Sequence, residues 1–122
     1  MRKSLIALSL CRWQLKDRDE GWYHLVGEKY VRVITNYGAF PFTVPALASD
    51  LDIDTVLDNV SGVLFGGSIS NIHPSFYGDD SEGAGLEDRD RDATVFPLMA
   101  AAIARGIPVL GLCRGIQEMN VL

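Results

Sequence analysis

The residues best suited to chemistry surround Cys113, in the segment 108–117 (PVLGLCRGIQ). An apolar stretch leads into the cysteine, Gly111 and Gly115 stand two positions before and after it, and a helix-forming segment follows at once. This is the layout of a nucleophile elbow, a sharp strand-to-helix turn that lifts one side chain above the edge of a sheet. The helix N-terminus beneath the sulfur stabilises the thiolate, which is the reactive form. The alternative is an inert cysteine packed at the end of a strand.

A second chemical feature is the pair Gly66-Gly67, which follows an apolar stretch just as Cys113 does. In a parallel sheet both loops leave at the carboxyl ends of the strands, where ligands bind. Neighbouring strands lie about 4.8 Å apart, so adjacent strands would bring these loops together. A glycine N–H there, with the N–H of Arg114, could bind a developing oxyanion. The alternative for the glycine pair is a plain turn at the end of a strand.

The elements that must position these loops alternate along the chain. Hydrophobic spacing predicts strands over 4–10, 40–44, 62–65 and 107–112, and helices over 22–37, 50–60, 91–105 and 115–122. This alternation predicts an α/β fold with a mostly parallel sheet. A doubly wound sheet of this kind would have the strand order 2-1-3-4 and would leave the fourth strand at an edge. Pro97 interrupts one helical pattern, so we expect that helix to start near Phe96 or to kink. The long polar segment 68–90 is expected to be a loop.

Composition excludes several classes of protein. The chain has 122 residues, 48% of them hydrophobic, and its 11 basic and 16 acidic residues give a net charge of −5. This argues for a globular domain and against nucleic-acid binding, which favours a basic face. No apolar stretch approaches the roughly 20 residues that span a bilayer. The short apolar stretch 4–10 reads as a buried strand rather than a signal peptide, so a cytoplasmic location is expected.

The negative charge is concentrated in segment 79–92, which holds seven acids and two arginines, whereas the other residues hold nine acids and nine bases. The simplest interpretation is a solvated loop. If the acids instead formed a rim at the site, they would favour cationic, amine-bearing substrates.

Several segments together resemble one family. The stretch 113–120 (CRGIQEMN) resembles class I glutamine amidotransferase-like hydrolases, and Arg directly after Cys is most similar to the gamma-glutamyl-gamma-aminobutyrate hydrolase family. The glycine-rich stretch 67–78, the Arg91-Asp92 pair and the segment 30–45 are similar to that family as well. One departure is Gly66, where the family often has proline.

The resemblance implies a flavodoxin-like, class I glutamine amidotransferase-like fold and hydrolysis of a gamma-glutamyl amide. Cys113 would attack the gamma carbonyl and form a glutamyl thioester, which water then cleaves. Gly67 and Arg114 would supply the oxyanion N–H groups, and Gln117 and Ser68 would bind the substrate. The expected partner is a small gamma-glutamyl molecule, with no cofactor, no metal, no nucleic acid and no membrane; a homo-oligomer is left open.

The catalytic base is the gap in this interpretation. The family's catalytic His and its acidic partner lie well downstream of the nucleophile, and this chain ends nine residues after Cys113. We expect His24 to play an ordinary helix-face role, and His73 matches no family base. Glu118 is expected to be solvated. Residues 1–122 are therefore interpreted as the N-terminal half of a single domain, truncated after the nucleophile elbow and inactive by itself.

Two alternatives stay open. The chain could be the glutaminase domain of an amidotransferase that supplies ammonia to a synthase, although the Cys-Arg-Gly elbow speaks against this. It could also be a truncated remnant without enzymatic activity.

Overall fold

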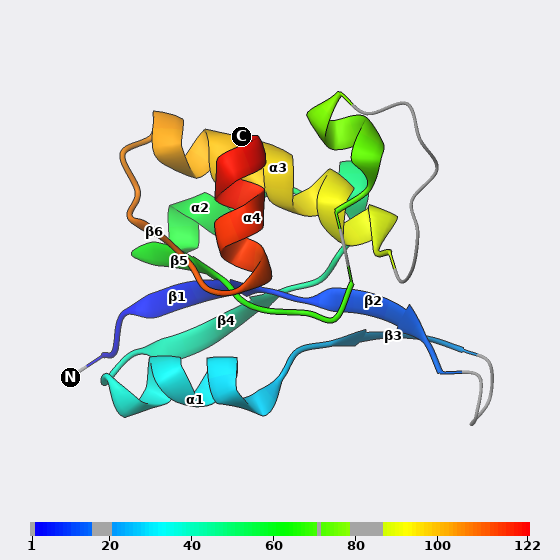
Figure 1. Ribbon diagram of the computed structural model, residues 1–122. Helices are drawn as coiled ribbons and strands as arrows, with labels where there is room; N and C mark the ends of the chain where they lie inside the picture. Colours follow the sequence, from blue (N-terminus) through cyan, green and yellow to red (C-terminus); the bar gives the residue numbers. More distant parts are fainter. Residues whose placement is uncertain (1, 16–20, 71, 79–86) are drawn as a thin grey trace.

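The parallel sheet at the centre of the computed structural model has four strands in the order β4-β1-β5-β6 (Figure 1). The structure describes residues 2–15, 21–70, 72–78 and 87–122. Every pairing in this sheet is parallel, and the order is the predicted 2-1-3-4. The strands are β1 (Leu5–Ser9), β4 (Phe40–Val44), β5 (Gly62–Phe65) and β6 (Val109–Gly111).

Helices cover both faces of the sheet. Figure 1 shows α1 (Glu28–Asn36) on one face and α2 (Ile53–Asn59) and α3 (Arg89–Ala104) on the other, with α4 (Arg114–Val121) directly after β6. This arrangement confirms the doubly wound α/β class. The chain also forms two short 3-10 turns, η1 (Ala48–Asp50) and η2 (Pro74–Tyr77).

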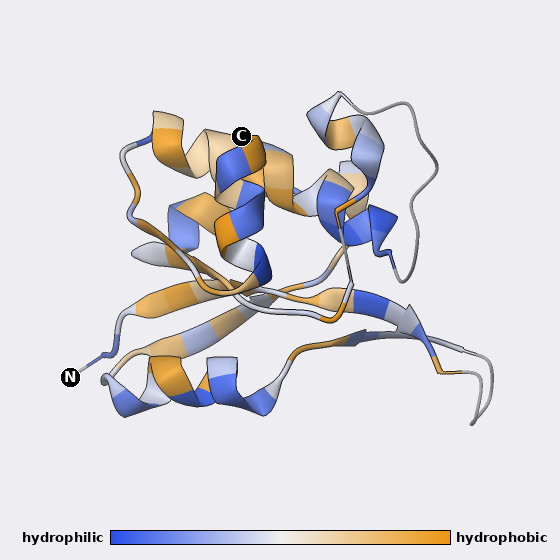
Figure 2. Cartoon of the chain, in the orientation of Figure 1, coloured by the Kyte–Doolittle hydropathy of each residue, from blue (hydrophilic) through white to orange (hydrophobic). Residues whose placement is uncertain are grey.

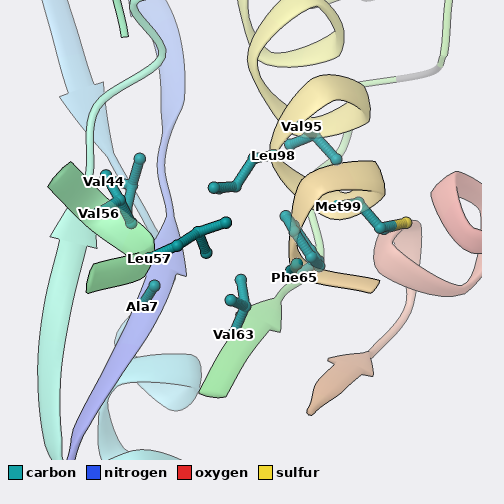
Figure 3. Close-up of a cluster of buried hydrophobic side chains, with 10 residues drawn as sticks. Ala7, Val44, Val56, Leu57, Val63, Phe65, Val95, Leu98 and Met99 are labelled. Carbon is teal, nitrogen blue, oxygen red and sulfur yellow. The ribbon is translucent and has the colours of Figure 1, made fainter. Parts of the chain in front are cut away.

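Each face of the sheet has its own core. The larger core lies between the sheet and the helices α2 and α3 (Figure 3) and contains these buried residues: Ala7, Val44, Val56, Leu57, Val63, Phe65, Val95, Leu98, Met99 and Ala102. The smaller core lies under α1 and contains Leu8, Tyr30, Ile34 and Leu64. Because Ala7 and Leu8 are both fully buried, β1 has no solvent-facing side along this part, as its unbroken apolar sequence predicts.

Aspartates fix where α2 and α3 begin. The side chain of Asp52 accepts a hydrogen bond from the N–H of Thr55 (3.1 Å), and that of Asp88 accepts one from Arg91 (3.0 Å). Such caps satisfy backbone donors that lack a partner in the first turn. Figure 2 shows that α3 is hydrophilic at its N-terminal end and hydrophobic further on, so one helix serves both a polar site and the core.

Residues 22–27 do not belong to a helix, contrary to the sequence prediction. Trp22–Leu25 forms strand β3, which pairs antiparallel with β2 (Cys11–Gln14), and α1 begins only at Glu28. The helical spacing of apolar residues misled here because the same positions also suit a short strand, and the pairing with β2 decides between them.

The helix α3 starts at Arg89 rather than near Phe96, and Pro97 lies inside it. Proline removes one internal hydrogen bond, a cost of about 3 kcal/mol in an isolated helix. Close packing of the flanking turns offsets this cost, since Leu98 and Met99 are fully buried against the sheet.

Within the described ranges β6 pairs with β5 alone, so it forms one edge of the sheet. Leu110 on this strand is 55% exposed. No helix in the described part of the chain is long and apolar enough to cross a bilayer.

The larger core yields a test of the fold. Replacing Leu98 with Ala should lower the free energy of unfolding by about 2–5 kcal/mol, because it leaves a cavity between α3 and the sheet. Urea denaturation of the two proteins measures the difference. The matched control is Ile103→Ala on the exposed side of the same helix, which should change stability by about 0.5 kcal/mol or less. Equal costs for the two variants would contradict the packing described here.

Candidate active site

Cys113 occupies a strained turn between β6 and α4. Its backbone has φ +56° and ψ −114°, and the residue is the N-cap of α4, with its side chain exposed. A β-carbon on Gly115 would overlap the carbonyl oxygen of Phe65, and one on Gly111 would lie 2.7 Å from the carbonyl oxygen of Gly115. Both glycines are therefore required by close backbone approach, and the turn has the geometry of a nucleophile elbow.

The Gly66-Gly67 loop lies directly beside this turn. The N–H of Leu112 donates to the carbonyl of Phe65 (2.9 Å), which extends the β5–β6 pairing up to the two loops. A β-carbon on Gly67 would lie 2.9 Å from the Cβ of Cys113. The two loops that the sequence analysis singled out thus meet at one edge of the sheet.

Tyr30 also lies where the two loops meet, and the sequence did not indicate it as a site residue. Its ring is buried in the smaller core, and a β-carbon on Gly66 would lie 2.8 Å from the ring, while one on Gly67 would overlap the hydroxyl. A hydrogen bond to Cys113, then burial, raise the pKa of Tyr30, while Lys29 and the N–H of Gly67 act in the opposite direction. The sequence signal for this contact was the Gly66-Gly67 pair. Adjacent glycines indicate that another group lies close to the backbone, but they do not identify that group as Tyr30.

A buried network of charges holds the loops from the other side. Arg91 donates to Glu118 (3.0 and 3.2 Å), Arg114 donates to Glu118 (2.6 Å), and Arg114 also donates to Asp92 (2.6 Å). All four side chains are at most 2% exposed. Arg91 further donates to the carbonyl of Gly66 (2.7 Å), and so ties the first glycine of the loop to α3. Buried ionic groups persist only when they are paired in this way.

Two expectations about charge are corrected by this network. Glu118 is not solvated but fully buried between two arginines, because the packing of α4 against α3 turns this residue inward. Of the described acids in segment 79–92, Asp92 is not solvated but is buried against Arg114, whereas Asp90, whose side chain is 44% exposed, pairs with Arg12 (2.7 Å). Asp88 is also buried, and burial raises its pKa. The remaining acids of the cluster, in 79–86, lie outside the described residues.

Neither histidine is placed as a base for Cys113. His24 lies on β3 rather than on a helix, and its Nδ1 accepts a hydrogen bond from the N–H of Ala46 (3.1 Å). His73 caps η2 through Nδ1, and its Nε2 lies 2.6 Å from the guanidinium of Arg89. Both rings serve local structure.

A cavity of about 440 Å³ opens beside Cys113. Gly67 and Ser68 line it together with Cys113. The hydroxyl of Ser68 lies 2.9 Å from that of Ser70, which fixes its position. Gln117 is exposed on α4 and does not line this cavity. In the described part of the chain, no three His, Cys, Asp or Glu side chains gather as metal ligands would.

Similarity to known proteins extends over nearly the whole chain. A model of the peptidase C26 family matches residues 4–122. A gamma-glutamyl-gamma-aminobutyrate hydrolase of Escherichia coli O157:H7 is 33% identical over 122 residues, which is 99% of this chain and 46% of that protein. A glutamine amidotransferase-like protein of Rickettsia prowazekii is 31% identical over 105 residues, 85% of this chain and 36% of that protein. The chain thus spans about half the length of the hydrolases it matches.

The buried network yields a stability prediction. Glu118→Gln should cost about 3–5 kcal/mol of unfolding free energy, because Arg91 and Arg114 lose the carboxylate they share. Chemical denaturation measures the loss. Asn120→Ala, at an exposed position of the same helix, is the control and should cost little. If both variants unfolded at the same denaturant concentration, the network would not support the elbow.

The contact between Tyr30 and Cys113 yields a titration prediction. In Cys113→Ala the pKa of Tyr30 should fall, because the hydrogen bond that contributes most to raising it is lost. Titration of tyrosine labelled with carbon-13 at Cζ, followed by NMR, resolves this residue from the other tyrosines. An unchanged Tyr30 titration would show that the hydroxyl does not meet the thiol.

Proposed function

The chain belongs to the peptidase C26 family, and from this premise we propose that the protein hydrolyses γ-glutamyl amide bonds with Cys113 as its nucleophile. The observation that carries the proposal is the strained, exposed position of Cys113 at the start of α4, beside Gly67 and at the wall of a cavity. Strain of this kind persists at sites where a reactive side chain must be presented. The relatives named as γ-glutamyl-γ-aminobutyrate hydrolases support the choice of bond.

The proposed reaction has two halves. The sulfur of Cys113 forms a bond to the γ-carbonyl carbon, and the carbonyl electron pair moves to oxygen. The N–H groups of Gly67 and Arg114 are proposed to bind this oxyanion. Collapse of the adduct breaks the carbon–nitrogen bond, the amine leaves with an added proton, and water then cleaves the glutamyl thioester to release glutamate and the thiol.

Tyr30 enters this scheme through its hydroxyl, which contacts both Cys113 and the N–H of Gly67. A carbonyl oxygen that binds Gly67 must share that N–H with the tyrosine oxygen or replace it. Tyr30 is therefore proposed to hold the thiol in place before the substrate enters. Gln117 and Ser68 are proposed to contact the glutamyl half.

The base is proposed to lie outside these 122 residues, since His24 and His73 are bonded elsewhere. We therefore expect the chain by itself to bind and react with γ-glutamyl electrophiles but not to turn over amides. An ammonia-supplying glutaminase domain is the second candidate, because several relatives carry the name glutamine amidotransferase. Such a domain would bind glutamine better than N-substituted γ-glutamyl amides.

A diazoketone analogue of L-glutamine tests the proposal. Its ketone stands where the γ-carbonyl group would, and its diazo carbon stands where the amide nitrogen would. The sulfur displaces dinitrogen from the protonated diazo carbon, so we expect the reagent to alkylate Cys113 and to spare Cys11, which is 2% exposed. Peptide mass spectrometry identifies the labelled cysteine, and Cys113→Ser should remove the label.

Protection by ligands gives the control for this labelling. N-substituted γ-glutamyl amides should slow the labelling of Cys113, and the D-enantiomer of the reagent should react more slowly than the L-form. If both enantiomers react alike and no γ-glutamyl compound protects, the site does not recognise the γ-glutamyl group. Protection by glutamine alone would favour the glutaminase candidate.

A further inference from the structure

The hydroxyl of Tyr30 lies between the two loops that carry Gly67 and Cys113. It forms a hydrogen bond with the side chain of Cys113 and accepts one from the N–H of Gly67. All three residues line the cavity beside Cys113. Under the proposed function, the N–H of Gly67 is also the group that binds the oxyanion. The oxygen of Tyr30 and the oxygen of a reacting carbonyl group must therefore be close neighbours.

The ring of Tyr30 is held too firmly to withdraw from this position. It is 6% exposed and belongs to the smaller core, together with Ile34 and Leu64. The backbone of Gly66 lies against the ring, since a β-carbon there would be 2.8 Å from it. Cores packed at protein density leave no void into which a ring could turn. The hydroxyl is therefore expected to stay beside the sulfur after a substrate enters, and to share the N–H of Gly67 rather than leave it.

The hydroxyl has a proton to donate during the reaction. The hydrogen bond to Cys113 and burial raise the pKa of Tyr30, so the phenol stays protonated at neutral pH. The N–H of Gly67 polarises the phenolic oxygen, and the ammonium group of Lys29 lies 5.2 Å from the centre of the ring. Both groups favour negative charge on that oxygen, and a hydroxyl polarised in this way is a stronger donor.

The acceptor of this proton changes as the reaction proceeds. Before the attack, the thiolate of Cys113 accepts the hydrogen bond. Once the sulfur–carbon bond forms, the negative charge leaves the sulfur and gathers on the former carbonyl oxygen. A hydrogen bond to a charged oxygen is roughly twice as strong as one between neutral groups. Rotation of the hydroxyl about its carbon–oxygen bond redirects the proton, which stays on the tyrosine throughout.

We propose that Tyr30 is a catalytic residue whose hydroxyl donates a hydrogen bond to the oxyanion, while the N–H of Gly67 supports the phenolic oxygen. The inference rests on the proposed function for Cys113 as the nucleophile, but not for the γ-glutamyl group. This role differs from holding the thiol in place. A hydroxyl that only holds the thiol affects every reaction of the sulfur, whereas one that binds the oxyanion specifically favours attack at a carbonyl carbon.

Two small reagents separate these roles. p-Nitrophenyl acetate transfers its acetyl group to the sulfur through an oxyanion and releases p-nitrophenolate, whereas iodoacetamide alkylates the sulfur by displacement of iodide and forms no oxyanion. In Tyr30→Phe, which keeps the ring in the core, the ratio of the acylation rate to the alkylation rate at Cys113 should fall about tenfold. The loss stays below the range for an unreplaced oxyanion donor, because the N–H of Gly67 becomes free to bind the oxyanion directly.

Peptide mass spectrometry measures each modification at Cys113. Tyr37→Phe is the matched control, because this tyrosine is 89% exposed and does not line the cavity, so its ratio should equal that of the wild-type protein. Cys11, which is 2% exposed, should stay unmodified in every folded variant. If Tyr30→Phe fails this check, incorporation of 3-fluorotyrosine takes its place. Fluorine makes the phenol a stronger donor, so the ratio should rise, and an unchanged or lower ratio would contradict the inference.

The result that would overturn the inference is an equal fall of both rates in Tyr30→Phe, which would limit the hydroxyl to positioning the thiol. A higher ratio would also overturn it, because the hydroxyl would then block the place of the oxyanion. The γ-glutamyl proposal is tested separately by the diazoketone. A protein that does not react with the diazoketone but shows the tenfold fall would lack γ-glutamyl recognition and still use Tyr30 as inferred.

Discussion

The buried ion network of Arg91, Glu118, Arg114 and Asp92 is the constraint on which the site depends. Removing these charges from water costs several kcal/mol each, and that cost is offset only when every partner is in place. The network therefore admits one arrangement of α3 and α4 and penalises any other. Because Arg114 follows the nucleophile directly, this arrangement also sets where the elbow lies.

The same network reaches the second loop of the site. Arg91 binds the carbonyl of Gly66 and approaches the sulfur of Cys11 (3.1 Å), so α3 holds the ends of two strands at once. Arg114 also donates to the carbonyl of Ser70, further along the glycine loop. The buried polar residues of α3, Arg91 and Asp92, therefore support the reactive residues from behind.

On the opposite face of the sheet, a single aromatic residue contacts the same loops. Tyr30 anchors α1 in the smaller core and carries a hydroxyl to Cys113, so the helix cannot shift without moving the contact to the thiol. Both glycines of the loop are required by this ring. The site thus lies between buried ion pairs on one face of the sheet and an aromatic contact on the other.

The amino-acid sequence by itself determined the α/β class and the elbow at Cys113. Both follow from local signals, because apolar periodicity, glycine spacing and the strand-to-helix junction can each be recognised within a segment of about ten residues. It did not determine strand β3, because apolar residues at 22 and 25 fit a strand and a helix equally well and the partner β2 decides.

Only the tertiary structure decided the roles of Glu118, Asp92 and Tyr30. A charged residue on a helix is expected to be solvated unless a buried partner is known, and Arg91, one of the two partners of Glu118, lies 27 positions away on α3. Tyr30 reads as a core residue, and it is one, but its hydroxyl reaches the nucleophile only because the parallel order places β5 between β1 and β6. Burial and long-range pairing depend on how the elements pack, and that is information a local pattern does not contain.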